Sequence, residues 1–357
     1  MSAPASPLWP AMAEAEIDEL GRELDELRRE VLDDLGEVDA RYIRRLIAFQ
    51  RGLEAASRVV LTVGARRRWA WWGGVVGLTV AKTLENLEIG HNVMHGQWDW
   101  MADPKIHSTT WEWDNCVPAE HWKHTHNFLH HTYTNVLGVD RDLGYSVLRV
   151  DRHQKWHPVY LAQPFYNVLL ALFFEQMSTL YDLGYYQSTK TKTDEELKEH
   201  AKVILRKVAE QNVKDYVAFP ALAGRNAVPV LLANLTANLV RSVWIHQISL
   251  CGHFPGEVPV FTEEWLENET RGRWYLRQMV ASCNFEGGRL VDLLSGYLSH
   301  QIEHHLYPDL PSRRYAHLAP RVREICERHG LPYHTGPFAK QVAGHWKKVF
   351  RMAFPGG

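Results

Sequence analysis

The sequence predicts an all-α protein with helices apolar enough to enter a membrane. Two observations support this fold class. Apolar residues near the N-terminus recur at steps of three and four, which is helical spacing, and several later segments run for 13 to 25 residues with one charge or none. In addition, no strand-like alternation, hairpin dipeptide or internal repeat stands out in the chain.

Composition alone argues against several classes of protein. The chain has 357 residues, with 40 Lys and Arg against 42 Asp and Glu, and a formal charge of -2. A nucleic-acid-binding protein would carry a basic excess, so nucleic acid is not an expected partner. The four cysteines form no C-x-x-C pair, which argues against a disulfide scaffold, a zinc ribbon or an iron–sulfur cluster.

The N-terminal segment is predicted to be an amphipathic helix. Its first 20 residues contain no basic region followed by an apolar core, so no secretory signal peptide is expected. Apolar positions from Ile17 to Val38 then follow helical spacing, with Glu and Arg on the other faces. The helix packs either on a partner surface or on its own domain, because the run is too short for a stable coiled coil.

Four apolar segments are candidates for membrane helices. Residues 158–181 carry one formal charge, Glu175, in 24 residues, and residues 216–240 carry one in 25. Residues 69–81 are uncharged, and residues 59–65 form a shorter apolar run. Crossing the hydrocarbon core takes about 20 mostly apolar residues. The alternative is that these segments are buried helices of a soluble α-protein.

The flanks of these segments support a membrane. Trp and Tyr lie near their ends, where they suit membrane interfaces, and the basic triplet 66–68 suits a cytoplasmic flank. Residues 193–212 are highly charged, with Glu one turn ahead of Lys, and are expected to form a helix in water.

Histidine is the unusual residue of this chain. There are 20 histidines, with eight between positions 91 and 131 and three between 300 and 305. They concentrate in three stretches: GHNVMHG with His91 and His95, HTHNFLHHTYTN with His126, His130 and His131, and HQIEHHLYP with His300, Gln301, His304 and His305. Residues four apart share a helix face, so each stretch aims two or three imidazoles at one point. Imidazole suits iron, zinc, copper and nickel.

The number of these histidines favours two metal ions. Seven histidines and a possible eighth exceed the four ligands that one zinc ion takes. The zinc-protease motif H-E-x-x-H is absent. A single pair at this spacing arises by chance, but three sets, two of them with adjacent His-His, favour a metal centre over purely structural roles.

The stretches HNVMHG, HNFLHHTYTN and QIEHHLYPDLP resemble the three histidine boxes of the membrane fatty acid desaturase family, in order and in spacing. The third, with Gln in place of the first His, is typical of front-end and related bacterial acyl desaturases. The resemblance covers residues 42–357. It implies an integral membrane helical domain there, with about four spans and a cytosolic helical cap that carries a diiron site. Residues 1–41 would form the amphipathic segment ahead of it.

The resemblance also implies a set of metal ligands. The positions that match the three boxes are His91, His95, His126, His130, His131, His304 and His305, with Gln301 in the variable leading position. The family uses one more His before the third box. Of His246 and His253, we expect His253, which follows the apolar run in a Gly-flanked turn.

Other polar residues near the boxes are given supporting roles. Asp140 and Asp142 are expected to support ligating histidines, with a solvated acidic loop as the alternative. His300 competes with Gln301 as a contact. His121 is expected to be supporting or interfacial, and His200 to be structural or at the surface.

By this resemblance the chain is an O2-dependent fatty acyl desaturase that inserts a cis double bond by means of two Fe ions. Its substrate is an acyl-CoA, an acyl-lipid or a sphingolipid. The sequence has no H-P-G-G segment and no G-x-G-x-x-G fingerprint, so electrons are expected from an external donor, a ferredoxin or a cytochrome b5-type protein with its reductase.

A cluster of basic residues is a candidate docking site for that donor or for a CoA phosphate, or it solvates a helix. These residues are Arg313, Arg314, Arg321 and Arg323. The expected location is a bacterial cell membrane, with the metal site cytoplasmic. Two other functions remain open: a lipid hydroxylase of the same histidine-box superfamily, and a non-enzymatic His-rich metal-binding membrane protein. The last would place His within the spans, whereas here the boxes flank them.

Overall fold

The computed structural model describes residues 9–189, 192–256 and 258–357. Over this part of the chain the all-α prediction is confirmed, because the described residues form helices, turns and isolated β-bridges but no strand. Residues 1–8, on which the absence of a signal peptide partly depends, lie outside the described residues.

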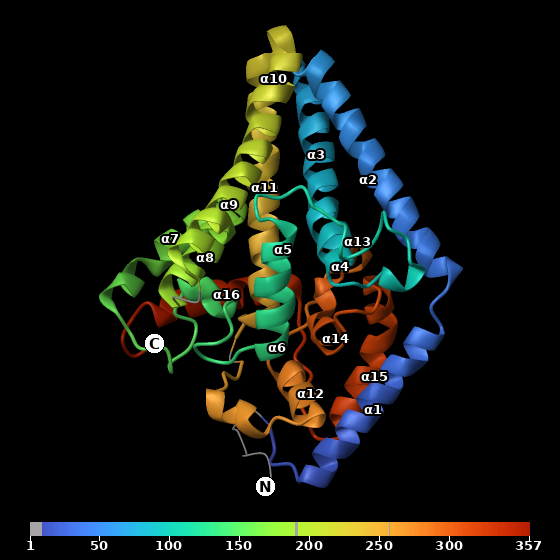
Figure 1. The fold of residues 1–357 in the computed structure, drawn as a ribbon, viewed down its shortest axis with the longest axis vertical. Coiled ribbons are helices and arrows are strands. Elements are labelled where there is room, and N and C mark those ends of the chain that lie inside the picture. Colours follow the sequence, from blue (N-terminus) through green and yellow to red (C-terminus); the bar gives the residue numbers. More distant parts are fainter. Residues whose placement is uncertain (1–8, 190–191, 257) are drawn as a thin grey trace.

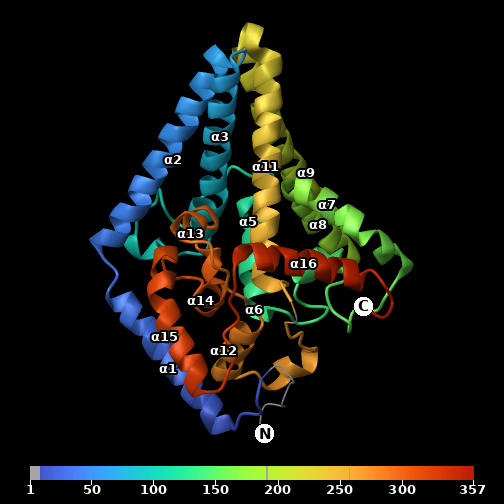
Figure 2. The same ribbon diagram turned by 180° about the vertical axis from the view of Figure 1, so that it is seen from behind.

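The molecule is widest near its middle (Figures 1 and 2). The tip at which α10 lies is here called the narrow end, and the broader half away from that tip is called the wide end. The long helices that converge on the narrow end are α2 (Glu37–Gly64), α3 (Arg68–Leu84) and α11 (Ala227–His253), and the short helix α10 (Phe219–Leu222) lies at that end beside them. The wide end gathers shorter helices, among them α5 (Ala119–Trp122), α6 (His131–Tyr133), α12 (Arg271–Val280), α14 (Gln301–Leu306), α15 (Tyr315–Arg328) and α16 (Phe338–Met352). The three histidine stretches all lie in or next to the elements of the wide end.

One helix in the described part of the chain, Gly224–His253, is long and apolar enough to cross a membrane. The expected segment 158–181 is not one continuous helix. It divides at Phe173, whose φ and ψ of -119° and 37° end α7 (Gln163–Leu172) before α8 (Phe174–Thr189) begins. Ten residues of α7 rise only about 15 Å, which is half of a hydrocarbon core.

Buried charges tie the long helices together. The Lys82 ammonium on α3 lies 2.8 Å from the Asp215 carboxylate, which also accepts from Arg58 on α2 at 3.1 Å. On α11, Arg241 pairs with Glu175 of α8. Each of these charges therefore has an opposite partner, which is the arrangement that a low-dielectric environment requires.

The N-terminal helix α1 (Glu14–Asp33) packs on its own chain, against α12 and α15. Its apolar face is fully buried there, with Ile17, Leu20 and Leu24 at 0% exposure. Gly21 of α1 faces Gly272 of α12, so the two backbones approach closely. Of the two sequence-based alternatives for this helix, docking on its own domain is the one found.

The basic residues considered as a docking site are engaged within the chain. Arg314 contacts Asp34 and Asp39 at 2.6 Å each, Arg321 pairs with Glu30, and Arg323 lies over the ring of Tyr333. Arg314 and Arg321 therefore hold the N-terminal helices against α15 and its preceding turn.

Candidate metal centre

Two of the three histidine stretches are wound as π-helix. One is η1 (Glu85–His91), which leads into α4 (Asn92–Met94), and the other is η3 (Lys123–His130), which leads into α6. The α-helical geometry predicted between His126 and His130 is therefore wrong, although their rings still lie 5.1 Å apart. Between His91 and His95 it is confirmed, because the His95 amide donates to the His91 carbonyl and the ring centroids are 4.6 Å apart. Short π-helical segments are frequent at functional sites because they redirect side chains within a helix.

Four histidines from all three stretches form a first group, here called cluster A. They are His91, His95, His126 and His304, and one nitrogen from each lies within 4.8 Å of the others. His91 ends η1, His95 follows α4, His126 lies in η3 and His304 lies in α14. This convergence of distant segments is what a tetrahedral or larger coordination sphere needs.

A second group, cluster B, lies beside the first and consists of His130, His253 and His305. Their nitrogens are also within 4.8 Å of one another. His131 lies between the clusters, with ring centroids 4.7 Å from His304 of cluster A and 4.4 Å from His305 of cluster B. Eight imidazoles thus surround two adjacent positions.

Carboxylates orient two of these rings from behind. The Nδ1 of His126 lies 3.0 Å from Asp142 Oδ2, and the Nδ1 of His130 lies 3.0 Å from Asp140 Oδ1. Asp140 is itself held by the backbone amides of Asn135 and Asp142 at 2.7 and 2.9 Å. The loop is therefore folded around its acidic residues, and the sequence-based alternative of a solvated acidic loop does not describe Asp140, whose side chain is fully buried.

Neutral side chains orient three further rings. Gln278 Oε1 lies 2.9 Å from His305 Nδ1, Asn92 Oδ1 lies 2.9 Å from His91 Nδ1, and the Tyr315 hydroxyl lies 3.4 Å from His304 Nδ1. Sequence reasoning missed all three of these partners. Asn92 carried a weak signal, since it sits inside the first box, whereas Gln278 and Tyr315 lie in other helices and carried none.

The nitrogens that face inward have no partner within the described part of the chain. On several rings Nδ1 bonds outward while Nε2 is buried and unpaired, and these rings are His126, His130, His304 and His305. On His131 both nitrogens are buried and unpaired. An outer hydrogen bond that fixes the tautomer and leaves the other nitrogen free is the pattern of metal-ligating histidine. The donor set therefore fits two transition-metal ions.

Burial and crowding keep most of these rings neutral. Burial, followed by the neighbouring imidazoles, holds the pKa of His131, His304 and His305 well below the usual histidine value. Burial also disfavours the cation at His130, but Asp140 and Asp142 outweigh it and raise the pKa of that ring. Neutral imidazole is the form that binds a metal ion, so the site is prepared for one.

Three residues that the sequence linked to the site lie at or beyond its edge. Gln301 approaches His253, with its Nε2 3.0 Å from His253 Nε2. His300 points instead toward Glu303, at 3.9 Å, and belongs to neither cluster. His246 is buried elsewhere, against Asn167 at 3.0 Å, so of the two candidates before the third box His253 is the one placed with the other rings.

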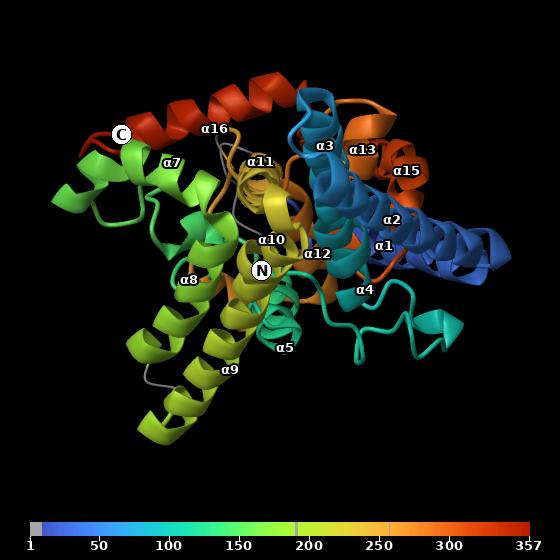
Figure 3. The ribbon, with the colours of Figure 1, turned by 90° about the horizontal axis from the view of Figure 1, so that it is seen from above.

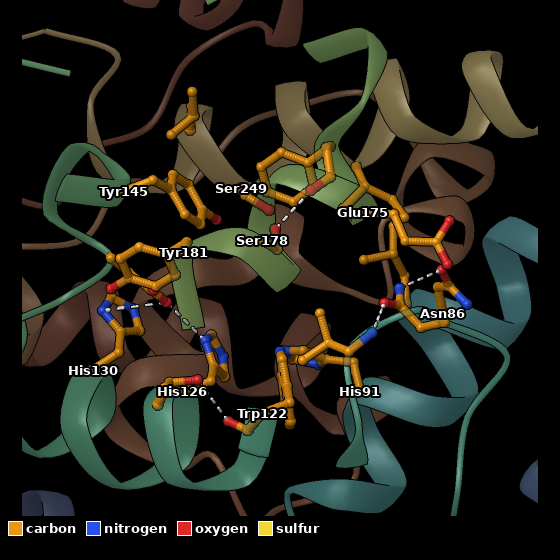
Figure 4. Close-up of a pocket in the computed structure, with 18 of the residues that line it drawn as sticks. Asn86, His91, Trp122, His126, His130, Tyr145, Glu175, Ser178, Tyr181 and Ser249 are labelled. Carbon is orange, nitrogen blue, oxygen red and sulfur yellow. Dashed lines mark hydrogen bonds and ion pairs between the residues drawn. The ribbon is translucent and has the colours of Figure 1, made fainter. Parts of the chain in front are cut away.

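A pocket with a volume of about 110 Å³ opens onto both clusters. Figure 4 shows His91, His126 and His130 along one side of this pocket and Tyr145, Ser178 and Ser249 across from them. The rest of its lining combines apolar residues with the carboxylates of Asp142, Glu175 and Asp182. The apolar residues are Leu87, Val117, Phe174, Ile245, Leu250, Phe254 and Leu298. The apolar part of this lining suits the hydrocarbon part of a ligand.

Comparisons with known proteins agree with one another. The family model described as fatty acid desaturase matches residues 68–337. A protein of Mycobacterium tuberculosis named NADPH-dependent stearoyl-CoA 9-desaturase is 48% identical over 352 residues, which cover 96% of this chain and 82% of the relative. The sn-1 linoleoyl-lipid 6-desaturase of Synechocystis is 25% identical over 291 residues, covering 78% of this chain and 79% of that one.

Proposed function

Because the chain belongs to the fatty acid desaturase family and is an oxidoreductase of that kind, we propose that it inserts a cis double bond into an acyl chain held in the pocket beside clusters A and B. The observation that carries this proposal is the set of inward, unpaired imidazole nitrogens at the pocket wall. They supply ligands next to the place where an acyl chain fits.

Each cluster would hold one iron ion, with His131 between them and Gln301 at the edge of cluster B. The ions would supply, with O2 and electrons, the oxidising power needed to remove hydrogen from unactivated methylene carbons. The residues of the chain supply the rest. The apolar wall excludes water, and Asp140, Asp142 and Gln278 fix the direction in which the rings point.

The substrate proposed is an acyl-CoA, since the relative that is 48% identical is named as a stearoyl-CoA desaturase. The acyl-lipid named for the Synechocystis protein is the second candidate. That first relative is also named NADPH-dependent, which supports NADPH as the ultimate electron source. We propose that a separate reductase and carrier deliver those electrons, because this sequence contains no G-x-G-x-x-G fingerprint.

The exposed apolar surface supports a membrane location with about four spans. Large apolar side chains of the narrow end are exposed, among them Val59, Val63, Trp69, Trp72, Val76, Leu222, Val228 and Leu232. We propose that α2, α3, α11 and the helical run through α10 enter the bilayer and that the wide end, with the metal centre, faces the cytoplasm. Residues 42–357 would form this domain, with residues 1–41 packed on its wide end.

Expression in a desaturase-deficient bacterium with NADPH, reductase and carrier tests the reaction. Chromatography of the lipids should reveal a new unsaturated acyl species, and His130→Ala should abolish it and lower the bound iron. The matched control is His153→Ala, because His153 also bonds a carboxylate but is 71% exposed and lies outside the clusters. A hydroxylated lipid as the main product would point to the hydroxylase alternative instead.

A further inference from the structure

A third group of metal-binding side chains lies away from clusters A and B. We propose that His121, Asp182 and His200 bind one zinc ion, which clamps the pair of helices α8 and α9 (Asp194–Val213) to α5. His121 is on α5, Asp182 on α8 and His200 on α9, and one atom from each lies within 4.8 Å of the others. Figure 3 shows α8 and α9 as a pair that extends from the body of the molecule beside α5.

The distances are close to those of a coordination sphere. Asp182 Oδ2 lies 2.8 Å from His200 Nε2 and 3.1 Å from His121 Nδ1. Ligand atoms of a tetrahedral zinc ion stand about 3.3 Å apart when the bonds to zinc are about 2.0–2.1 Å. Two histidines and one carboxylate are also a common donor set for zinc, with water at the fourth position. A zinc ion therefore fits between the three side chains once they move slightly apart.

The burial of the carboxylate calls for a positive charge. The Asp182 side chain is 2% exposed, and its Oδ1 has no hydrogen-bond partner. The rings of His121 and His200 stack face to face, with centroids 3.8 Å apart and planes at 11°. Burial and the neighbouring His121 ring lower the pKa of His200, which favours the neutral form of that ring. A divalent cation would neutralise the buried carboxylate that both rings approach.

The stacking also defines the movement that binding requires. An ion cannot lie in the planes of two parallel rings at once, so one ring must turn about χ2, a torsion that is broad in histidine. This rotation of one side chain requires no movement of the helix backbone. From the sequence, we expect His200 to be either structural or at the surface. Its side chain is only 6% exposed, so it does not lie at the surface.

The position of the group relates it to the acyl pocket. Asp182 and its neighbour Tyr181 line the pocket, and so does Trp122, which follows His121 in the chain. The Trp122 ring stacks on His126 of cluster A, with centroids 4.5 Å apart. An ion at this group would therefore fix the wall of the pocket at the point where α8 meets α5.

Metal analysis of the iron-loaded enzyme tests this site separately from desaturation. After dialysis against micromolar Zn²⁺, the wild type should retain one zinc ion per chain beyond its iron. His200→Gln and Asp182→Asn should each lose that zinc and keep the iron, while His153→Ala, at an exposed His–Asp pair without a second histidine, should keep both. His304→Ala should lower the iron and leave this zinc in place.

Two results would overturn the proposal. One is a wild-type protein that holds no metal beyond iron under these conditions. The other is zinc retained to the same extent by His200→Gln and Asp182→Asn. As a second measurement, added Zn²⁺ should raise the thermal unfolding midpoint of the wild type and not that of either variant, because only the wild type binds the ion in its folded state.

Discussion

Most imidazoles in the two clusters are aimed by a side chain behind them. Asp140 does this for His130 and is held in turn by two backbone amides, so its own position is fixed. Such outer partners set both the tautomer and the direction of a ligating ring, and their loss typically costs 10–100-fold in metal affinity. Single residues outside the histidine boxes therefore control how well the boxes hold metal.

We expect Asp140→Asn to weaken iron binding by roughly 10–100-fold. The amide would place a donor against either the Nδ1–H of His130 or a backbone amide that already donates to Asp140. Competition with a chelator measures the change. Asp151→Asn is the matched control, since Asp151 bonds the exposed His153 and should leave iron binding unaltered. Equal iron affinity in the wild type and Asp140→Asn would contradict this role for Asp140.

Glu303 should make the protein less stable as pH rises. Burial raises the pKa of this carboxyl to about 7, although hydrogen bonds from Tyr333 and Asn284 oppose the shift. The unfolded chain, with a pKa near 4.5, then loses its proton first, so the free energy of unfolding falls between pH 4.5 and 7. The loss is on the order of 3 kcal/mol.

Glu303→Gln removes this contribution, because the amide does not titrate. Thermal unfolding of the metal-free protein in detergent should therefore show the midpoint of the variant rising relative to the wild type from pH 5 to pH 8. Glu324→Gln, at an exposed position of α15, serves as the control and should keep the wild-type pH dependence. Parallel curves for the wild type and Glu303→Gln would show that Glu303 does not titrate in this range.

Sequence spacing identified the box histidines of both clusters, and the family resemblance added His253, but only part of what surrounds them was foreseen. The boxes are local patterns, so short-range spacing reveals them, and Asp140 and Asp142 lie just beyond the second box. Gln278 and Tyr315 come from α12 and α15, and their contacts with His305 and His304 exist only after the helices pack. Long-range partners of this kind leave no pattern in one sequence.

At the scale of helices, the contact between α1 and α12 depends on the absence of side chains. A Cβ on Gly272 would lie 2.2 Å from the backbone oxygen of Ile17, which is closer than atoms can approach. The two helices would have to separate and uncover the apolar face of α1. Overpacking of this kind costs about 1–3 kcal/mol.

We therefore expect Gly272→Ala to lower the thermal unfolding midpoint and to make α1 a better substrate for limited proteolysis. Gly52→Ala is the matched control, because a Cβ at Gly52, in the middle of α2, meets no atom within 4 Å. That change should be neutral or stabilise the helix by about 0.5–1 kcal/mol. An α1 helix equally protected in Gly272→Ala and the wild type would contradict a close glycine contact.

Helical periodicity predicted the existence of the main helices better than their winding. The steps of three and four identified the buried face of α1, with Ile17, Leu20, Leu24 and Leu27. The same spacing continued to Val38, which is wrong, because α1 ends at Asp33 and Val38 is exposed on α2. The π-helical turns of η1 and η3 were not predictable, since an inserted residue is stabilised by contacts with the rest of the fold. The break at Phe173 was hidden for a related reason, because the segment around it is uniformly apolar.

At the scale of the molecule, the narrow end and the metal centre lie far apart along α2 and α3 (Figure 1). The turn that joins these helices contains Arg66 and Arg67, and Arg66 donates to the backbone oxygen of Arg225 in the neighbouring turn. The sequence suggested a cytoplasmic flank for this basic triplet and also a cytoplasmic metal site. If α2 and α3 cross the bilayer, only one of these two assignments can hold.

Cysteine labelling decides between them. The four native cysteines are buried, so a cysteine introduced at the surface can be labelled without background from them. We expect Arg67→Cys to react with an impermeant maleimide on intact cells, and Glu324→Cys, at the wide end, to react only after lysis. The positive charges of the turn would then lie outside the cytoplasm. Labelling of both positions from the same side would contradict a crossing by α2 and α3.

Cluster A takes its fourth ring from His304, and cluster B takes its third from His305, near the end of the chain. A nascent chain that ends before the third stretch therefore has neither group of histidines complete. If each group holds an iron ion as proposed, both ions bind only after the third stretch has been synthesised and has packed against the first two.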